Sequence, residues 1–393
     1  MGSNKTNTLY FQKKLRELRK EDLYRELRVI EEFSNIGKGA RVLGVNNFSS
    51  NDYLGLSMNT FLRRNLRKLH ISRVSQCSSR LISGNTESLE NLEKALSKHR
   101  KTQSSLLYPT GFMANLGVIG CVSDKETIIY SDELNHASII DGCKLTPSKI
   151  HPFPHNNIDE LEKSIKKHGN KRKIIVTEGI FSMDGDMANL TEITRISNEH
   201  NCILIVDDSH GDFIIGNSRL KDYGGTPSYF GVNKAIDIHI SSLSKGLGCF
   251  GGYVSCSKLV RDYLINKSRP FIFTSALPDS LAEIATMSLQ IAKIGNLQTK
   301  LYRNIEYFHK IANEQKINSR NIEKSPIIPL LIGSEKKALE VSKKLLRRHF
   351  FVHAIRYPTV KRNEARLRIS LNTNHNPEQI YTLLENIAKL LRD

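Results

Sequence analysis

Short apolar runs alternate with longer amphipathic segments through the middle of this chain. Each run is followed by a cluster of polar residues, and the segments between them, such as NIDELEKSIKKH and LTEITRISNEH, carry apolar residues at helical spacing. The runs are TIIY (127–130), IIVT (174–177), ILIV (203–206) and IDIHI (236–240). This alternation predicts an α/β fold with a mostly parallel central sheet covered by helices on both faces. Ligands bind outside the carboxyl ends of the strands in such sheets, so the polar clusters are the candidate site.

The N-terminal segment has a different pattern. KKLRELRKEDLYRELRVIEEF predicts a charged amphipathic helix over the first thirty or so residues. Its apolar positions are Leu15, Leu18, Leu23, Leu27 and Ile30. A lone helix cannot bury such a face, so we expect it to pack on another domain or subunit. The following VLGVNNFSSNDYLGLS predicts an extended segment.

The pattern changes again after residue 285. One long helical stretch, SLAEIATMSLQIAKIGNLQTKLYRNIEYFHKIANEQ, is followed by strand-like IIPLLIG, a helix, FFVHAI, RLRISL and a closing helix, PEQIYTLLENIAKLL. This order predicts a smaller α+β domain. We therefore expect a helix and extended segment over residues 1–55, a large α/β domain over residues 56–285 and a small C-terminal domain over residues 286–393.

The chain is strongly basic, with a formal net charge of +18 from 58 Lys and Arg against 40 Asp and Glu. The basic residues are spread over helix-like stretches such as LEKSIKKHGNKRK, which favours a solvated basic surface over a nucleic-acid groove. No stretch has the roughly 18 apolar residues of a membrane span, and the N-terminal segment lacks the apolar part of a signal peptide. We therefore expect a cytoplasmic protein that binds neither nucleic acid nor membrane. The six cysteines lack C-x-x-C spacing, so neither a zinc site nor a disulfide framework is expected.

Four successive strand ends carry residues that can perform chemistry. In chain order they are His136, Glu178 with Ser182, Asp207 with His210, and Ser242 with Lys245. Taken singly, three of them have a structural interpretation: His136 as a helix cap, His210 as a hydrogen-bonded loop residue and Asp207 as a cap for the next helix. A metal-dependent hydrolase fits less well, because DDSH offers ligands but no second cluster of His and carboxylate accompanies it.

Together these residues match what pyridoxal 5'-phosphate (PLP) requires. This cofactor needs a lysine for its Schiff base, a carboxylate at its ring nitrogen, a flat group over its ring, nearby hydroxyls and backbone amides for its phosphate. In YPTGFMANLGVIG, Gly111 and Phe112 would begin a helix whose N–H groups face an anion. The small residues around Lys245 in SSLSKGLGCFGG leave room for a flat ring. We therefore predict PLP as the cofactor, and no metal.

Nine motifs in order give the chain a resemblance to a known family over residues 20 to 390. They are NNFSSNDYLGLS, SSRLISGNTESLENLE, YPTGFMANLG, NHASIIDG, VTEGIFSMDGDMANL, IVDDSHG, SLSKGLG, FIFTSALP and ARLRISLNTNH. With these motifs the chain resembles the α-oxoamine synthases, which are fold-type I PLP-dependent transferases of the aspartate-aminotransferase-like kind. The resemblance implies a homodimer with shared active sites.

The resemblance also implies a role for each matching residue. Lys245 would form the Schiff base, Asp207 would pair with the ring nitrogen, His210 would bond the ring hydroxyl group and His136 would stack on the ring. The remaining implied contacts are Gly111 and Phe112 with the phosphate, Ser182 and Ser242 along the cofactor, Thr274 and Ser275 with the partner subunit's phosphate, and Asn51 with Arg368 at the carboxylate of the amino acid. Relatives often have alanine at Ser209 and threonine at Ser242, and a glycine-rich stretch where this chain has SQCSSRL.

The family joins a small amino acid to an acyl thioester and releases carbon dioxide. NFSSNDYLGLS and HAIRYPTV resemble the branch that uses L-alanine and a pimeloyl thioester, carried by CoA or a carrier protein. In that branch Arg356 would meet the far carboxylate of the acyl chain and Arg25 would lie near the acyl channel; a surface salt bridge is the alternative for both. The other reaction considered is that of glycine with acetyl-CoA. The alternative from another class is a basic binding protein without activity, although such a protein would have lost Lys245 or Asp207.

Overall fold

The computed structural model describes residues 3–27, 29–32, 44–69, 73–319 and 324–392. Its main feature is a seven-stranded sheet in the order β3-β9-β8-β7-β6-β4-β5. The strands are β3 (Ser104–Tyr108), β4 (Ile128–Asp132), β5 (Lys149–Phe153), β6 (Lys173–Glu178), β7 (Ile203–Asp207), β8 (Ile238–Ser242) and β9 (Gly252–Cys256). β5, β4, β6, β7 and β8 run parallel, and β9 is antiparallel to both of its neighbours. The predicted α/β fold with a mostly parallel sheet is confirmed.

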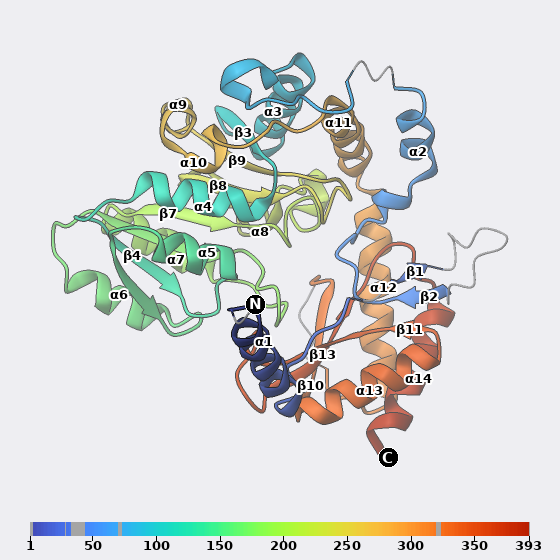
Figure 1. The fold of residues 1–393 in the computed structure, drawn as a ribbon. Helices are drawn as coiled ribbons and strands as arrows, with labels where there is room; N and C mark the ends of the chain where they lie inside the picture. The colour runs from blue at the N-terminus through green and yellow to red at the C-terminus, as the bar shows by residue number, and fades with distance from the viewer. Residues whose placement is uncertain (1–2, 28, 33–43, 70–72, 320–323, 393) are drawn as a thin grey trace.

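Helices cover both faces of this sheet (Figure 1). Successive residues of a strand point to opposite faces, and within β6 Ile174 and Val176 join one buried cluster whereas Ile175 joins another. The first cluster includes residues of α4 (Gly111–Val122), α5 (Ala137–Lys144), α9 (Lys258–Lys267) and α10 (Arg269–Ile272). The second includes residues of α6 (Ile158–Lys166) and α7 (Leu190–Glu199). Burial on both faces explains why the strands are continuous apolar runs.

The C-terminal part forms a second, smaller α+β region. Its antiparallel sheet has the order β10-β13-β12, with β10 (Ile327–Gly333), β13 (Ala365–Ser370) and β12 (His353–Ile355). Its helices are α12 (Asn296–Glu314), α13 (Glu335–Arg347) and α14 (Pro377–Arg392). The other helices of the chain are α2 (Thr60–Leu66), α3 (Glu87–Arg100), α8 (Gly225–Phe230) and α11 (Asp279–Lys293).

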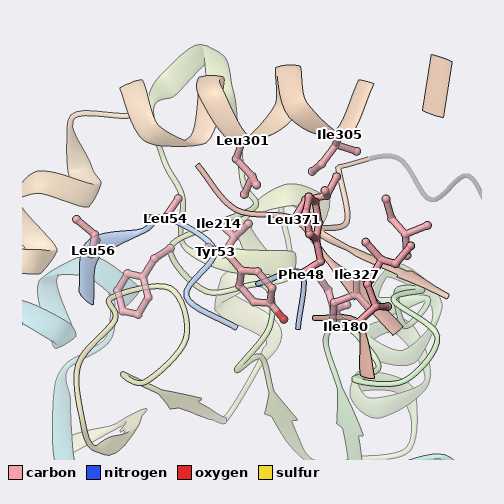
Figure 2. Close-up of a cluster of buried hydrophobic side chains, with 14 of the residues drawn as sticks. Phe48, Tyr53, Leu54, Leu56, Ile180, Ile214, Leu301, Ile305, Ile327 and Leu371 are labelled. Atoms are coloured by element: carbon pink, nitrogen blue, oxygen red, sulfur yellow. The ribbon is translucent and has the colours of Figure 1, made fainter. Parts of the chain in front are cut away.

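The N-terminal extended segment joins this C-terminal region. β2 (Gly44–Asn47) lies between β1 (Glu31–Glu32) and β11 (Phe350–Phe351) and pairs with both in parallel. Beyond β2, the chain adds Phe48, Tyr53, Leu54 and Leu56 to the buried cluster that Leu301 and Ile305 of α12 also enter (Figure 2). The two ends of the sequence therefore share one core. The division into domains at residues 55 and 285 stays a prediction, and α11 crosses the second boundary.

The N-terminal helix is shorter than its apolar pattern predicts. α1 (Ser3–Lys20) ends before Leu23, so the predicted helix beyond it is wrong for the described residues. Asp22 takes a left-handed conformation with φ 57°, and the N–H groups of Leu23 and Tyr24 donate to the carbonyl of Leu18. This arrangement closes the last turn of the helix, a position that glycine usually holds.

The predicted single helix over residues 280 to 315 is also wrong. It is two helices, α11 and α12, because Gly295 between them has φ 86° and cannot continue a right-handed helix. The six cysteines are free in the structure, four of them buried and Cys77 exposed. None of the helices within the described residues is long and apolar enough to cross a membrane.

Candidate active site

The carboxyl ends of β4, β6, β7 and β8 lie at one edge of the central sheet. These strands are neighbours and parallel, so the segments that leave them emerge together. Glu178, the last residue of β6, is paired in register with Asp207, the last residue of β7. Burial, together with the charge of Asp207, raises the pKa of Glu178 well above its usual range. The edge therefore holds two acidic side chains, and Glu178 keeps its proton more readily than an exposed glutamate does.

Lys245 and His210 are in direct contact. Nζ of Lys245, in the loop after β8, lies 2.9 Å from Nε2 of His210, in the loop after β7. Desolvation lowers the pKa of Lys245, although the charges of Asp207 and Glu178 oppose this shift. Desolvation, with the nearby charge of Lys245, also lowers the pKa of His210 well below its usual value. The amine of Lys245 thus loses its proton more readily than that of an exposed lysine. The imidazole of His210 is uncharged.

The carboxylate of Asp207 is held at both oxygens. Oδ1 accepts hydrogen bonds from the backbone N–H of Ser209 at 3.0 Å and from its hydroxyl at 2.6 Å. Oδ2 accepts a hydrogen bond from Nδ2 of Asn115 at 2.6 Å, and Asn115 also donates to the hydroxyl of Ser138. Donors on both oxygens fix the orientation of the carboxylate. Sequence reasoning missed Asn115, although it lies within the motif YPTGFMANLG.

The segment after β3 contains the start of a helix where the sequence predicts an anion site. α4 begins at Gly111, and the hydroxyl of Thr110 accepts a hydrogen bond from the N–H of Met113. The first turn of a helix has no internal acceptors for its N–H groups, which leaves those of Gly111 and Phe112 for an anion. The start of α4 packs closely on β9, and only a residue without a side chain fits there. A Cβ on Gly252 of β9 would lie 2.3 Å from the backbone nitrogen of Gly111.

His136 precedes α5 and has two features at once. Its Nδ1 accepts a hydrogen bond from the N–H of Ser138, so the helix-cap interpretation holds. The side chain is also exposed beside Phe112, with ring centroids 6.4 Å apart. Desolvation nevertheless lowers the pKa of His136. An uncharged, accessible imidazole near the N-terminus of α4 suits stacking on a flat ring.

Asn51 and Arg368 form the predicted pair. Nη1 of Arg368, on β13, donates to Oδ1 of Asn51 at 3.1 Å and to the hydroxyl of Ser370 at 2.7 Å. Its Nε donates to the backbone carbonyl of Ser182 at 2.6 Å. Tyr53, which sequence reasoning missed, connects this pair to the catalytic edge, because its hydroxyl oxygen lies 3.2 Å from Oδ1 of Asn51 and 2.6 Å from Nδ1 of His210.

The remaining predicted cofactor residues lie around this centre. Ser242 ends β8, and its hydroxyl lies 2.7 Å from that of Ser244. A Cβ on Gly111 would approach the Cβ of Ser242 to 3.3 Å, so Ser242 borders the anion site. Thr274 and Ser275 line a small cavity with Tyr108 and Pro109, next to the same site, and Ser275 is exposed. Their implied contact with a partner subunit stays a prediction.

Arg25 and Arg356 lie in neighbouring segments but are bound differently. Arg356 is buried, and it donates to the backbone carbonyls of Asp22 and Tyr24, each at 2.7 Å. Arg25 is exposed, and its Nη2 donates to the hydroxyl of Thr359 at 3.3 Å. Arg356 therefore orders the segment that carries Arg25. The predicted contact of either arginine with an acyl chain stays a prediction.

One group of side chains in the described part of the chain could hold a metal ion, and it lies on another part of the surface. It consists of Glu162, Glu199 and His200. Arg195 already donates to Glu162 at 2.9 Å and to Glu199 at 2.8 Å. The arginine charge therefore occupies the position that a cation would need.

Comparison with known proteins defines the class. Residues 44–387 match the aminotransferase class I and II family, and the chain belongs to this family. Within it, a relative from Thermoanaerobacter pseudethanolicus named 8-amino-7-oxononanoate synthase is 36% identical over 388 residues, which cover 97% of this chain and 96% of the relative. A relative of the same name from Lysinibacillus sphaericus is 36% identical over 387 residues, 97% of each chain.

Solved structures agree with this assignment. The 8-amino-7-oxononanoate synthase from Francisella tularensis superposes with a TM-score of 0.76 at 27% identity, over 88% of this chain and 98% of that one. A structure of SPT, serine palmitoyltransferase, with a PLP internal aldimine superposes with a TM-score of 0.84 at 26% identity. The superposition covers 88% of this chain and 87% of that one. The predicted family and the predicted fold are confirmed.

Proposed function

We propose that the protein is a PLP-dependent 8-amino-7-oxononanoate synthase. It would condense L-alanine with a pimeloyl thioester and release the thiol of CoA or of a carrier protein together with carbon dioxide, as a step of biotin biosynthesis in the cytoplasm. The observation that carries the proposal is the contact of Lys245 with His210 beside Asp207, in a chain that relatives of this name match over 97% of its length.

The residues present fit PLP. The N–H groups of Gly111 and Phe112 at the start of α4 would hold the phosphate, and the small residue Gly252 permits the close backbone approach there. The carboxylate of Asp207 would bind the ring nitrogen, His136 would cover one face of the ring and Lys245 would hold the carbonyl carbon. When bound, PLP supplies an electron-poor ring that takes up the electron pair released at the α carbon of the substrate.

Lys245 is the group that moves the proton of that α carbon. An amine removes a proton only in its uncharged form, and the lowered pKa of Lys245 increases that form at neutral pH. Asp207, whose carboxylate accepts three hydrogen bonds, would face the ring nitrogen and stabilise a positive charge there. Proton removal and charge stabilisation thus come from adjacent strand ends.

Arg368 and Asn51 are assigned to the carboxylate of the amino acid. The guanidinium of Arg368 is buried, and its contacts with Ser182, Ser370 and Asn51 fix its plane. A fixed, planar donor set suits a carboxylate better than a flexible ammonium would. The two residues come from opposite ends of the sequence and meet at this position.

We propose Arg25, rather than the Arg356 that the sequence predicts, for the far carboxylate of the pimeloyl chain, with Arg356 ordering the segment that carries Arg25. Arg25 is exposed, whereas Arg356 is occupied by two backbone carbonyls. Arg25→Ala should raise the KM for pimeloyl-CoA and leave the KM for alanine unchanged. An equal rise in both constants would contradict this assignment.

A second copy of this chain is the partner we propose. α1 exposes large apolar side chains, which are Leu9, Tyr10, Phe11, Leu15 and Leu18. Such a face is expected to be buried by association. Sedimentation of the purified protein should give a dimer, and a monomer at micromolar concentration would contradict it.

A donor screen tests the function. The purified enzyme with PLP should form product from L-alanine and pimeloyl-CoA, with a much lower rate from glycine and acetyl-CoA. It should be yellow and lose its colour with borohydride, and Lys245→Ala should abolish both the colour change and the condensation. Preference for glycine and acetyl-CoA would move the protein to another branch of the family. A protein that takes up no PLP would overturn the enzymatic assignment.

A further inference from the structure

A chain of hydrogen-bonding groups runs from Lys245 to Arg368. Nζ of Lys245 lies 2.9 Å from Nε2 of His210, and Nδ1 of His210 lies 2.6 Å from the hydroxyl oxygen of Tyr53. That hydroxyl lies 3.2 Å from Oδ1 of Asn51, which Nη1 of Arg368 approaches to 3.1 Å. The chain connects the two halves of the site, because Lys245 follows the central sheet and Arg368 belongs to the small sheet.

Arg368 fixes which atom of Asn51 faces it. A guanidinium only donates, so the atom of Asn51 that faces it must be the amide oxygen. The hydroxyl oxygen of Tyr53 faces the same amide oxygen, and the single hydrogen available between them is that of the phenol. Tyr53 is fully buried, where an unpaired hydroxyl would be costly. The phenol can give its one hydrogen to Oδ1 of Asn51 or to Nδ1 of His210, and a phenol that donates to Asn51 has no second hydrogen to give.

The direction of the Tyr53 bond decides the tautomer of His210. A phenol that donates to Asn51 can only accept from His210, so in that arrangement Nδ1 of the imidazole carries a hydrogen. Burial keeps the ring uncharged, which leaves Nε2 with a lone pair. Nε2 then accepts a hydrogen from Lys245. The lone pair of the uncharged amine is left free for a carbon atom.

We propose that Tyr53 donates to Asn51 and is thereby a positioning residue that holds His210 as the Nδ1–H tautomer, so that the imidazole accepts from Lys245 and leaves the amine lone pair unoccupied. The inference stands on the contacts of the protein without cofactor. Its value for catalysis rests on the proposed function. The charged groups near Lys245 and His210 that the structure identifies are Asp207, Asp208, Glu178, His136 and Arg368. None of them is altered in the variants of Tyr53 and Asn51 below.

The tautomer can be measured in the apoprotein by 15N NMR of histidine side chains. The His210→Gln variant assigns the His210 signals. In the wild-type protein we expect a protonated Nδ1 and an unprotonated Nε2. In Asn51→Leu the phenol loses its acceptor and turns to donate to Nδ1, so His210 should become the Nε2–H tautomer. A wild-type Nε2–H tautomer, or an unchanged tautomer in Asn51→Leu, would overturn the proposal.

Reactivity of Lys245 gives a second readout. In Tyr53→Phe, Nδ1 loses its acceptor, the hydrogen moves to Nε2, and Nε2 then donates to the lone pair of Lys245. We expect acylation of Lys245 in the apoprotein, followed by mass spectrometry at a pH where the amine is uncharged, to be about fivefold slower, as for one net hydrogen bond. An unchanged or faster rate would contradict the proposed direction of the bonds.

A matched control lies on β4 of the central sheet. The hydroxyl of Tyr130 lies 2.7 Å from Nδ1 of His168, so Tyr130→Phe removes a similar contact of a buried tyrosine elsewhere. It should leave both the His210 tautomer and the acylation rate of Lys245 unchanged. If it lowers the acylation rate as much as Tyr53→Phe does, the effect comes from a general loss of rigidity in the protein, and the proposal fails. Since neither measurement uses PLP, alanine or a thioester, the result is independent of the donor screen.

Discussion

Nε2 of His155 lies 2.7 Å from Oδ2 of Asp186. Nδ1 of the same ring lies 3.0 Å from Oδ1 of Asp132, the last residue of β4. Asp186 follows Ser182 in the loop after β6, and Arg366 of β13 holds Asp184 in the same loop at 2.5 Å. Two bonds from one ring to two carboxylates require His155 to carry both protons. A charged imidazolium thus joins the Ser182 loop to the central sheet.

The stability that His155 provides should depend on pH. Burial opposes its charge, but the hydrogen bonds to Asp132 and Asp186 prevail and raise its pKa to about 10. A folded pKa above the unfolded value of about 6.5 means that the full contribution is present below pH ~6.5 and is lost as the pH rises to about 10. His155→Gln should therefore lower the free energy of unfolding most at neutral pH and least above pH 10. Denaturant unfolding across this range measures the difference.

The neighbouring His151 provides the control. Burial lowers the pKa of His151, so its protonation does not favour the folded state. His151→Gln should show no loss of stability that disappears between pH 7 and 10. A His155→Gln penalty that stays constant over this range would contradict the charged bridge.

The anion site should depend on the missing side chain of Gly252. In Gly252→Ala the new methyl group would meet the backbone of Gly111 and Thr110 and displace the start of α4. We expect the Kd for PLP to rise about tenfold or more, because an extra methyl group in a filled site costs ~1–3 kcal/mol. Titration of the apoprotein measures the Kd. Gly120→Ala, which has open space around it on the same helix, should bind PLP normally.

The charge at Asp207 should be sensitive to Asn115. Asn115→Asp keeps the shape but places a second carboxylate at the position of a donor that lies 2.6 Å from Asp207. Two carboxylates this close do not both ionise, so one of them takes up a proton. We expect about 100-fold lower kcat at pH 8 and partial recovery at lower pH, as the new acid becomes protonated and donates again. A pH profile parallel to that of the wild type would argue against this role.

Arg368 should control the affinity for the amino acid. Lysine at this position keeps the charge but loses the planar donor set that reaches Ser182, Asn51 and Ser370. We expect Arg368→Lys to raise the KM for alanine about 30-fold, or ~2 kcal/mol, with little change for pimeloyl-CoA. Arg195→Lys, on the surface helix α7, serves as control. Equal losses for both substrates would point to a general disturbance of the site.

The sequence was informative where one local pattern decides the structure. Each predicted strand is a run of apolar residues, and burial on both faces of the sheet requires such runs, so the strand ends with Asp207 and Ser242 could be located. The strands β3 and β9 were harder to predict, because they contain serine or glycine and are antiparallel to each other. The end of α1 was missed because an aspartate, not a glycine, adopts the left-handed conformation there.

The missed site residues depend on partners far away in the sequence. Asn115 contacts Asp207 across 92 residues, and Tyr53 contacts His210 across 157. Asparagine and tyrosine in an apolar context have ordinary packing interpretations, and no local spacing shows which distant group will face them. The bond between Arg356 and the carbonyls of Asp22 and Tyr24 could not be predicted for the same reason.

The contact of Asn51 with Arg368 has a consequence for how the protein is made. It spans 317 residues, so a chain emerging from the ribosome can complete the central sheet before Arg368, the residue proposed to bind the carboxylate of the amino acid, has been made. Closing so long a loop is slow relative to forming local helices and strands. A protein truncated before β13 would keep every residue assigned to the cofactor and lack the one that selects a substrate by its carboxylate. We therefore expect competence to bind PLP to arise earlier in synthesis than competence to bind alanine.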